Sequence, residues 1–176
     1  MTAPGFTGAG LDRADHLRLD EGQLAALMAG AQARFLALAE LDPVLDGEGR
    51  LQWNGAAEAE ETIFLGLDGE TPLFAPLVRL EAVGQRAWSV FRLLSLMSPR
   101  DAAIWGAARS LNEWHNRHLF CSACGAPTLH FRGGWGRRCG GCGAEHFPRV
   151  DPVVIMLAEH RGRVLLARQS QYPHGH

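Results

Sequence analysis

The four cysteines of this chain form two Cys-x-x-Cys-Gly motifs, one at Cys121 and Cys124 and the other at Cys139 and Cys142, with fourteen residues between Cys124 and Cys139. A tight turn that carries two thiolates two residues apart can direct both sulfurs at one metal ion, and the glycine that follows tolerates a positive φ. Two such turns supply four thiolates to a closed tetrahedral site. The spacing therefore predicts a structural zinc ion in a ribbon fold.

Other uses of these cysteines are less consistent with the sequence. The first five residues, Met-Thr-Ala-Pro-Gly, contain no basic residue and begin no apolar segment, so we expect no export signal and reduced cysteines in the cytoplasm. A redox-active Cys-x-x-Cys would need only one motif and would leave the second without a role. Iron in place of zinc stays open, because the ligands alone do not separate the two metals.

The overall charge is nearly balanced, at −2 over 176 residues, which argues against bulk nucleic-acid binding. All seventeen basic residues are arginines, and from Arg109 onward nine arginines face four acidic residues. This end could contact phosphates, although scattered surface charge explains the pattern equally well. No apolar run reaches the roughly 18 residues of a membrane helix, so we expect no membrane partner.

The first half of the chain predicts a small domain that mixes helix and strand. After a polar lead-in of twenty residues that we expect to be poorly ordered, Asp20 caps a helix with an apolar face. Residues 62–67 and 71–77 then predict a β-hairpin around Asp68-Gly69. Pro72 and Pro76 predict that its second strand lies at an edge of the sheet.

The second half must position the cysteines. Ser98 and Pro99 begin a helix whose apolar stripe runs to Trp114, just before the first motif. Residues 129–131 and 135–138 flank Gly133-Gly134 as a hairpin that carries the second motif, and we expect Trp135 to pack on the ribbon. Residues 153–158 read as a strand buried on both faces, and residues 164–167 as its return strand.

Residues 107–169 resemble the NAD(H) pyrophosphatase branch of the Nudix hydrolases. The matching segments are the helix from Ala108 to Cys121, both cysteine motifs, Phe147-Pro-Arg-Val-Asp-Pro-Val-Val-Ile-Met, and Val164-Leu-Leu-Ala-Arg-Gln. The resemblance implies an α+β chain with an N-terminal domain at 1–97, a linking helix and Cys₄ zinc ribbon at 98–147, and the first strands of an incomplete Nudix α/β/α sandwich at 148–176.

The resemblance also implies an activity. Such enzymes hydrolyse the pyrophosphate of NAD(H) to NMN(H) and AMP, bacterial relatives remove NAD caps from RNA, and the enzymes are dimers. Their Mg²⁺ or Mn²⁺ is held by glutamates of the Nudix box, Gly-x₅-Glu-x₇-Arg-Glu-x-x-Glu-Glu-x-Gly. That box does not occur in these 176 residues. We therefore assign no catalytic residue and expect the chain, read as a truncated portion of such an enzyme, to be inactive by itself.

Two substrate contacts are implied by the same resemblance. Arg92 matches an arginine that relatives place before the linking helix, and Phe147 matches an aromatic residue that lies against a base. Core packing beside Pro148 is an equal explanation for Phe147, and a salt bridge between domains is one for Arg92. The alternative function is a non-catalytic zinc-ribbon module that binds RNA or a protein partner. That alternative leaves the strand pair after the ribbon unexplained.

Overall fold

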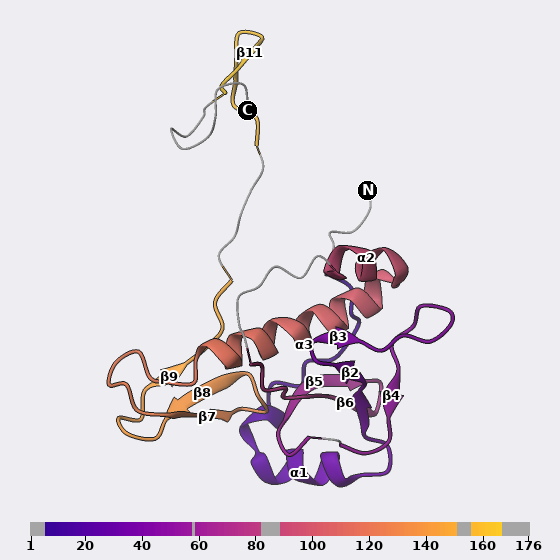
Figure 1. The fold of residues 1–176 in the computed structure, drawn as a ribbon, viewed down its shortest axis with the longest axis vertical. Coiled ribbons are helices and arrows are strands. Elements are labelled where there is room, and N and C mark those ends of the chain that lie inside the picture. The colour runs from indigo at the N-terminus through magenta and orange to yellow at the C-terminus, as the bar shows by residue number, and fades with distance from the viewer. Residues whose placement is uncertain (1–5, 58, 82–88, 151–155, 167–176) are drawn as a thin grey trace.

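The computed structural model describes residues 6–57, 59–81, 89–150 and 156–166 (Figure 1). In chain order the elements are η1 (Leu17–Leu19), α1 (Glu21–Ala29), β1 (Arg34–Leu36), β2 (Leu38–Ala39), β3 (Asp42–Pro43), β4 (Trp53–Asn54), β5 (Thr62–Asp68), β6 (Thr71–Pro76), α2 (Ser89–Leu96), α3 (Pro99–Arg117), β7 (Thr128–Phe131), β8 (Gly136–Cys139), β9 (Glu145–His146), β10 (Glu159–His160) and β11 (Arg163–Val164). This mixture of helices, sheets and a four-cysteine ribbon confirms the predicted α+β class.

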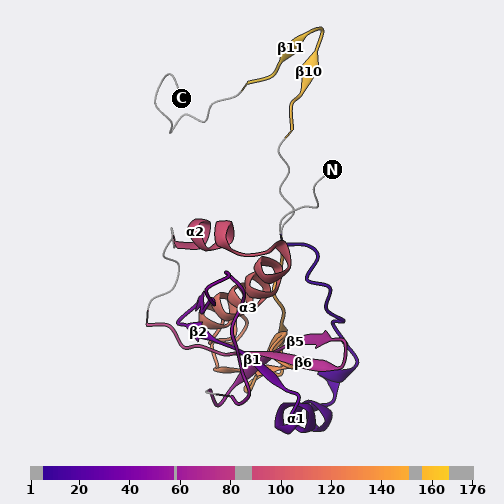
Figure 2. The same cartoon turned by 90° about the vertical axis from the view of Figure 1, so that its right-hand side faces the viewer.

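A four-stranded sheet in the order β4-β1-β6-β5 forms the centre of the N-terminal part. Helices α1 and α3 cover its two faces, as Figure 2 shows. On the α1 side, Phe35, Phe64 and Phe74 are buried and their rings pack at centroid distances of 5.4 Å. On the α3 side lies a larger cluster that includes Leu36, Ile63 and Trp105. The sheet is therefore buried on both faces, as its apolar strands require.

The predicted hairpin of β5 and β6 is confirmed, but the prediction that β6 is an edge strand is wrong. β6 lies between β5 and β1. Its parallel pairing with β1 involves only Leu73 and Phe74. Pro72 and Pro76 stand outside that pairing, opposite Leu67 and Thr62 of β5. β6 tolerates two prolines although it is an interior strand, because its pairing with β1 involves only residues that lie between them.

The prediction that the N-terminal lead-in is poorly ordered is wrong for its described part, residues 6–20. Ala9 and Ala14 are buried, and Asp12 exchanges two main-chain hydrogen bonds with Leu67 of β5, of 3.0 and 2.8 Å. The lead-in thus pairs with the free edge of β5. At its end Asp20 caps α1 as predicted, accepting from the N–H of Gln23 at 2.9 Å.

Helix α3 begins as the sequence predicts, with the Ser98 hydroxyl accepting from the N–H of Asp101 at 3.0 Å. Its apolar stripe packs on the N-terminal sheet, and the indole of Trp105 donates to the carbonyl of Leu41 at 2.8 Å. The helix that we grouped with the ribbon thus also completes the N-terminal core. The division into domains stays a prediction.

Two asparagines on α3 hold the chain that leaves β6. Asn112 accepts from the N–H of Val78 at 2.7 Å, and Asn116 accepts from the N–H of Leu80 at 3.0 Å. Their amide groups also donate to the carbonyls of Pro76 and Val78. Each side chain thus satisfies a donor and an acceptor of an extended segment that pairs with none of the described strands.

The predicted strand pair near the C-terminus is only partly observed. Residues 151–155 and 167 lie outside the described residues, and residues 156–158 are irregular rather than a strand. The hairpin forms further along, with Glu159 opposite Val164 and His160 opposite Arg163. Met156 and Leu157 are nearly four-fifths exposed. An apolar run becomes a buried strand only where other elements cover it, and no described element does so. None of the described helices is long and apolar enough to cross a membrane.

Candidate metal centre

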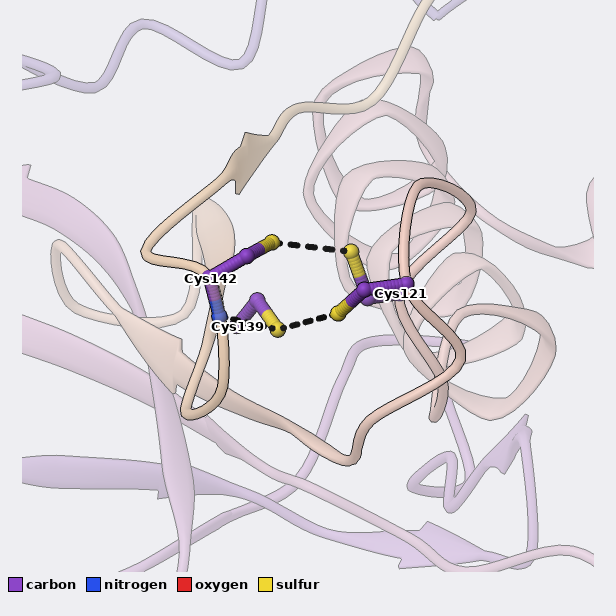
Figure 3. Close-up of side chains that lie close together, drawn as sticks. Cys121, Cys139 and Cys142 are labelled. Atoms are coloured by element: carbon purple, nitrogen blue, oxygen red, sulfur yellow. Dashed lines mark hydrogen bonds between the residues drawn. The ribbon is translucent and has the colours of Figure 1, made fainter.

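The four cysteines converge at one point, as the close-up in Figure 3 shows for three of them. The sulfurs of Cys121 and Cys142 are 3.7 Å apart, those of Cys124 and Cys139 are 3.4 Å apart, and all four lie within 4.8 Å of one another. A tetrahedral zinc ion with bonds of about 2.3 Å separates its sulfurs by about 3.8 Å, whereas a disulfide is about 2.05 Å long. The site fits zinc, and the four cysteines are free thiols.

The two motifs repeat the same local structure. In each, the N–H of the first cysteine donates to the carbonyl five residues on, at 2.8 Å from Cys121 and 2.9 Å from Cys139. The glycine after the second cysteine donates back to the carbonyl of the first. Gly125 and Gly143 both have positive φ, of 75° and 73°, which is the reason that the motifs need glycine there.

Main-chain N–H groups also point at the sulfurs. The N–H groups of Cys142 and Gly141 donate to Cys139 and lower its pKa to about 6. At Cys124 the N–H of Ala126 favours the thiolate, but shared hydrogen bonds with Cys139 and Cys142 outweigh it and raise the pKa to about 12. Adjacent thiolates repel one another unless a cation lies between them. Zinc supplies that charge and displaces the remaining protons on binding.

The ribbon sheet, in the order β7-β8-β9, supports the second motif. Neither neighbouring histidine is needed by the metal. His118 bonds through Nδ1 to the carbonyl of Trp114 at 2.7 Å, and His146 lies in β9 opposite Arg137. Among the described residues the four cysteines are the only group of three or more metal-binding side chains. A site closed by four thiolates leaves no position for a reacting water, so this zinc is structural.

The hairpin turn of the ribbon is fixed to the free side of β5. The N–H of Phe64 donates to the carbonyl of Gly133 at 2.8 Å, and the indole N–H of Trp135 donates to the carbonyl of Phe64 at 2.7 Å. The guanidinium of Arg18 lies 3.9 Å from the Trp135 ring centre. The prediction that Trp135 packs on the ribbon is therefore wrong. It packs against the N-terminal sheet, because a strand edge with free carbonyls lies within its reach.

A second, buried contact joins α3 to the ribbon. His115, fully buried, bonds through Nε2 to the carbonyl of Gly134 at 2.7 Å and through Nδ1 to Arg137 at 3.0 Å. Arginine can only donate, so Nδ1 accepts and Nε2 carries the proton. Arg137 also donates hydrogen bonds to the hydroxyl and carbonyl oxygens of Thr128. Burial lowers the pKa of His115 to about 4 and also lowers that of Arg137.

This network could not be predicted from the sequence. The only available signal was a histidine on the apolar face of the predicted helix, with an arginine in the predicted hairpin. A link between two such residues over 22 positions cannot be seen in either segment alone. The consequence is a ribbon held to the N-terminal part through both its turn and its central strand.

The two predicted substrate contacts do not converge within one chain. Arg92 is an exposed residue of α2, at the N-terminal end of α3, whereas Phe147 follows β9 near the C-terminal end of α3 (Figure 1). With 19 residues, α3 is about 28 Å long. Phe147 is 44% exposed and packs on Phe131 rather than in a core, with ring centres 5.8 Å apart. The roles of Arg92 and Phe147 stay predictions.

Comparison with known proteins supports one family. Residues 116–147 match the NADH pyrophosphatase zinc ribbon domain. The chain is 33% identical over 185 residues to the NAD-capped RNA hydrolase NudC of Mycobacterium tuberculosis strain H37Rv, a match covering 98% of this chain and 58% of that protein. It is 35% identical over 127 residues to the human NAD(P)H pyrophosphatase NUDT13, mitochondrial, covering 69% and 36%. It is 47% identical over 76 residues to Nudix hydrolase 19, chloroplastic, of Arabidopsis thaliana, covering 41% and 17%.

The chain thus spans a little over half the length of the mycobacterial relative, and the similarity includes the N-terminal part as well as the ribbon. Four sulfurs at zinc spacing lie in the segment that matches the family's ribbon domain. The chain belongs to the NADH pyrophosphatase branch of the Nudix hydrolases.

Proposed function

We propose that this chain takes part in hydrolysis of the pyrophosphate of NAD(H) to NMN(H) and AMP, and in removal of NAD caps from RNA. The observation that carries the proposal is the similarity over 98% of the chain to a protein named NAD-capped RNA hydrolase. The structure supports it with a zinc-compatible ribbon in the segment that matches the ribbon domain of NADH pyrophosphatases.

The chain's own contribution is structural support rather than catalysis. Its closed thiolate site would hold zinc, and the ribbon it organises is bonded to β5 and α3, which fixes the ribbon's orientation. Hydrolysis needs Mg²⁺ or Mn²⁺ to neutralise the diphosphate and to activate water. We propose that these ions bind in the part of the relatives that this chain does not span. The 176 residues should then be inactive by themselves.

The remaining proposals concern the assembly. The protein is proposed to act in the cytoplasm as a homodimer, with Arg92 and Phe147 in contact with substrate. Their placement at opposite ends of α3 supports a site built from two protomers, because one dinucleotide cannot reach across about 28 Å of helix within a single chain. A purine that stacks on Phe147 would gain roughly 1–3 kcal/mol.

The experiment reads the gene beyond codon 176, expresses the longest open reading frame, and incubates both this product and the 176-residue chain with NADH and Mn²⁺. We expect the frame to continue into a Nudix box, the longer product to release NMNH and AMP, and the short chain to release neither. A stop codon followed by unrelated sequence, or AMP release by the short chain, would contradict the proposal.

A zinc-ribbon module that binds RNA or a protein without catalysis is the second candidate. The observation that favours it is the exposure of Phe120 and Leu129 on the ribbon, each 67% exposed, with Arg138 opposite Leu129 in the sheet. The two candidates differ in the sequencing result above, since a module needs no Nudix box.

A further inference from the structure

The four cysteines form two close pairs, and each pair joins one motif to the other. The sulfurs of Cys121 and Cys142 are 3.7 Å apart, and those of Cys124 and Cys139 are 3.4 Å apart. Figure 3 draws both contacts as dashed lines across the centre. A covalent bond between two contacting sulfurs would therefore link the motifs to each other rather than close a ring within one motif.

Each pair combines one exposed and one buried cysteine. Cys124 and Cys142 are exposed, whereas Cys121 and Cys139 are only 4% and 3% exposed. A small oxidant dissolved in water therefore reaches one sulfur of each pair first, and the shielded sulfur lies directly beside it. An accessible thiolate next to a second cysteine is the arrangement in which oxidation ends in a disulfide.

Main-chain N–H groups hold the two buried sulfurs in place. The sulfur of Cys121 accepts from the N–H of Ala123 at 3.4 Å. The sulfur of Cys139 accepts from the N–H groups of Gly141 and Cys142, at 3.3 and 3.4 Å. These bonds lie within the turns themselves and do not involve a metal ion. Because a disulfide is about 2.05 Å long, the sulfurs of each pair need to approach by only about 1.5 Å.

We propose that the metal centre is a reversible switch that responds to hydroperoxides. In the reduced state four thiolates hold zinc. In the oxidised state the centre contains the disulfides Cys121–Cys142 and Cys124–Cys139, and the ion has been released. The switch goes beyond the proposed function and does not depend on it, since every group involved belongs to this chain.

The chemistry balances with hydrogen peroxide as the oxidant. The sulfur of Cys124 attacks one peroxide oxygen, so that an S–O bond forms, the O–O bond breaks and hydroxide leaves. The sulfur of Cys139 then attacks the resulting sulfenic acid, so that an S–S bond forms and a second hydroxide leaves. Both hydroxides take up a proton and become water. Two electrons thus pass from one pair of thiolates to one peroxide.

The second pair reacts in the same way, beginning at Cys142 and ending at Cys121. In total, four zinc-bound thiolates, two molecules of peroxide and four protons give two disulfides, one Zn²⁺ ion and four molecules of water. Disulfide sulfurs are no longer thiolates, and thiolates are the form of cysteine that binds zinc, so the ion leaves.

The ribbon's contacts with the N-terminal part do not pass through the metal. The N–H of Phe64 donates to the carbonyl of Gly133, and the indole of Trp135 donates to the carbonyl of Phe64. On the other side, Nε2 of His115 donates to the carbonyl of Gly134. These bonds persist when the ion leaves, and the two disulfides then join the motifs in its place. The oxidised chain should therefore stay folded and accept zinc again after reduction.

The test titrates the reduced, zinc-loaded 176-residue chain with hydrogen peroxide. A chromogenic indicator measures released zinc, and thiol titration after denaturation counts the remaining thiols. The protein is then alkylated and cut with trypsin. Cys121 and Cys124 fall in the peptide 118–132, and Cys139 and Cys142 fall in the peptide 139–149. A disulfide between motifs joins the two peptides, whereas a disulfide within a motif leaves them separate.

We expect two equivalents of peroxide to release close to one zinc per chain, to remove all four thiols and to join the two peptides. Tryptophan fluorescence should keep its folded spectrum, and dithiothreitol with added zinc should restore both the thiols and the bound metal. Two matched variants test the pairing. Cys124→Ser should still join the peptides through Cys121 and Cys142, and Cys121→Ser should join them through Cys124 and Cys139.

Three results would overturn the inference: zinc that stays bound in excess peroxide, a disulfide within each separate peptide, or oxidation that dithiothreitol and zinc do not reverse. The parent chain alone decides each of these, so the test holds even if a serine variant fails to fold. None of the readouts involves hydrolysis. Failure here would leave the proposed function intact, and a longer product without NADH hydrolysis would leave the switch intact.

Discussion

Acidification should weaken the junction between α3 and the ribbon through His115. The pKa of this buried imidazole is lowered from 6.5 to about 4, chiefly by burial. Between those two values the unfolded chain binds more protons than the folded chain, so the free energy of unfolding falls as the pH drops through that window. The linkage relation gives a loss of about 2 kcal/mol between pH 8 and pH 5, and of about 3 kcal/mol once the pH is below 4.

The assay is urea unfolding of the zinc-loaded chain, followed by tryptophan fluorescence at pH 8 and pH 5, for the parent and for His115→Gln. Glutamine can still donate to Gly134 and accept from Arg137, but it does not titrate. Neighbouring charges on the facing elements, Arg137, Arg79 and the Glu61-paired His130, are the same in both proteins, as are the cysteines. The parent should lose about 2 kcal/mol more than the variant. Equal losses would refute the reasoning.

Three substitutions test how the ribbon and α3 are held. Asn116→Ala leaves two main-chain groups beyond β6 without partners and should cost about 1–3 kcal/mol in urea unfolding; a change under 0.5 kcal/mol would contradict the bonds described. Trp135→Phe removes the hydrogen bond to Phe64 and should cost about 1 kcal/mol while zinc stays bound, as metal analysis would show. Gly134→Ala places a Cβ 3.0 Å from Ile63 at a φ of 84°, and its melting temperature should fall by several degrees; an unchanged melting curve would show that the turn is not pressed on β5.

Features that depend on neighbouring residues could be predicted from the sequence. The cysteine motifs, the caps at Asp20 and Ser98 and the Asp68-Gly69 hairpin each have their cause within a few residues. The metal centre combines two such local turns, and the spacing of the four cysteines was enough to predict that they meet. Its zinc assignment agrees with both the sulfur geometry and the ribbon domain match.

Features that depend on distant segments could not be predicted. The position of β6 is set by β1, which pairs with only two of its residues. The Trp135 side chain packs on the N-terminal sheet rather than on the ribbon, because its indole N–H donates to the carbonyl of Phe64, a residue 71 positions away in the sequence. Polar residues on α3, such as Asn112, look like surface positions until the segment after β6 is placed beside them. Such contacts arise from tertiary packing, which residue spacing along one segment does not encode.

The zinc content of the purified chain tests the central claim most directly. Metal analysis combined with thiol titration after denaturation should find close to one zinc per chain and four reactive thiols. In the variant Cys121→Ser, with one ligand missing, the zinc content should fall well below that value. A metal-free chain in which the cysteines are joined as disulfides would contradict the account.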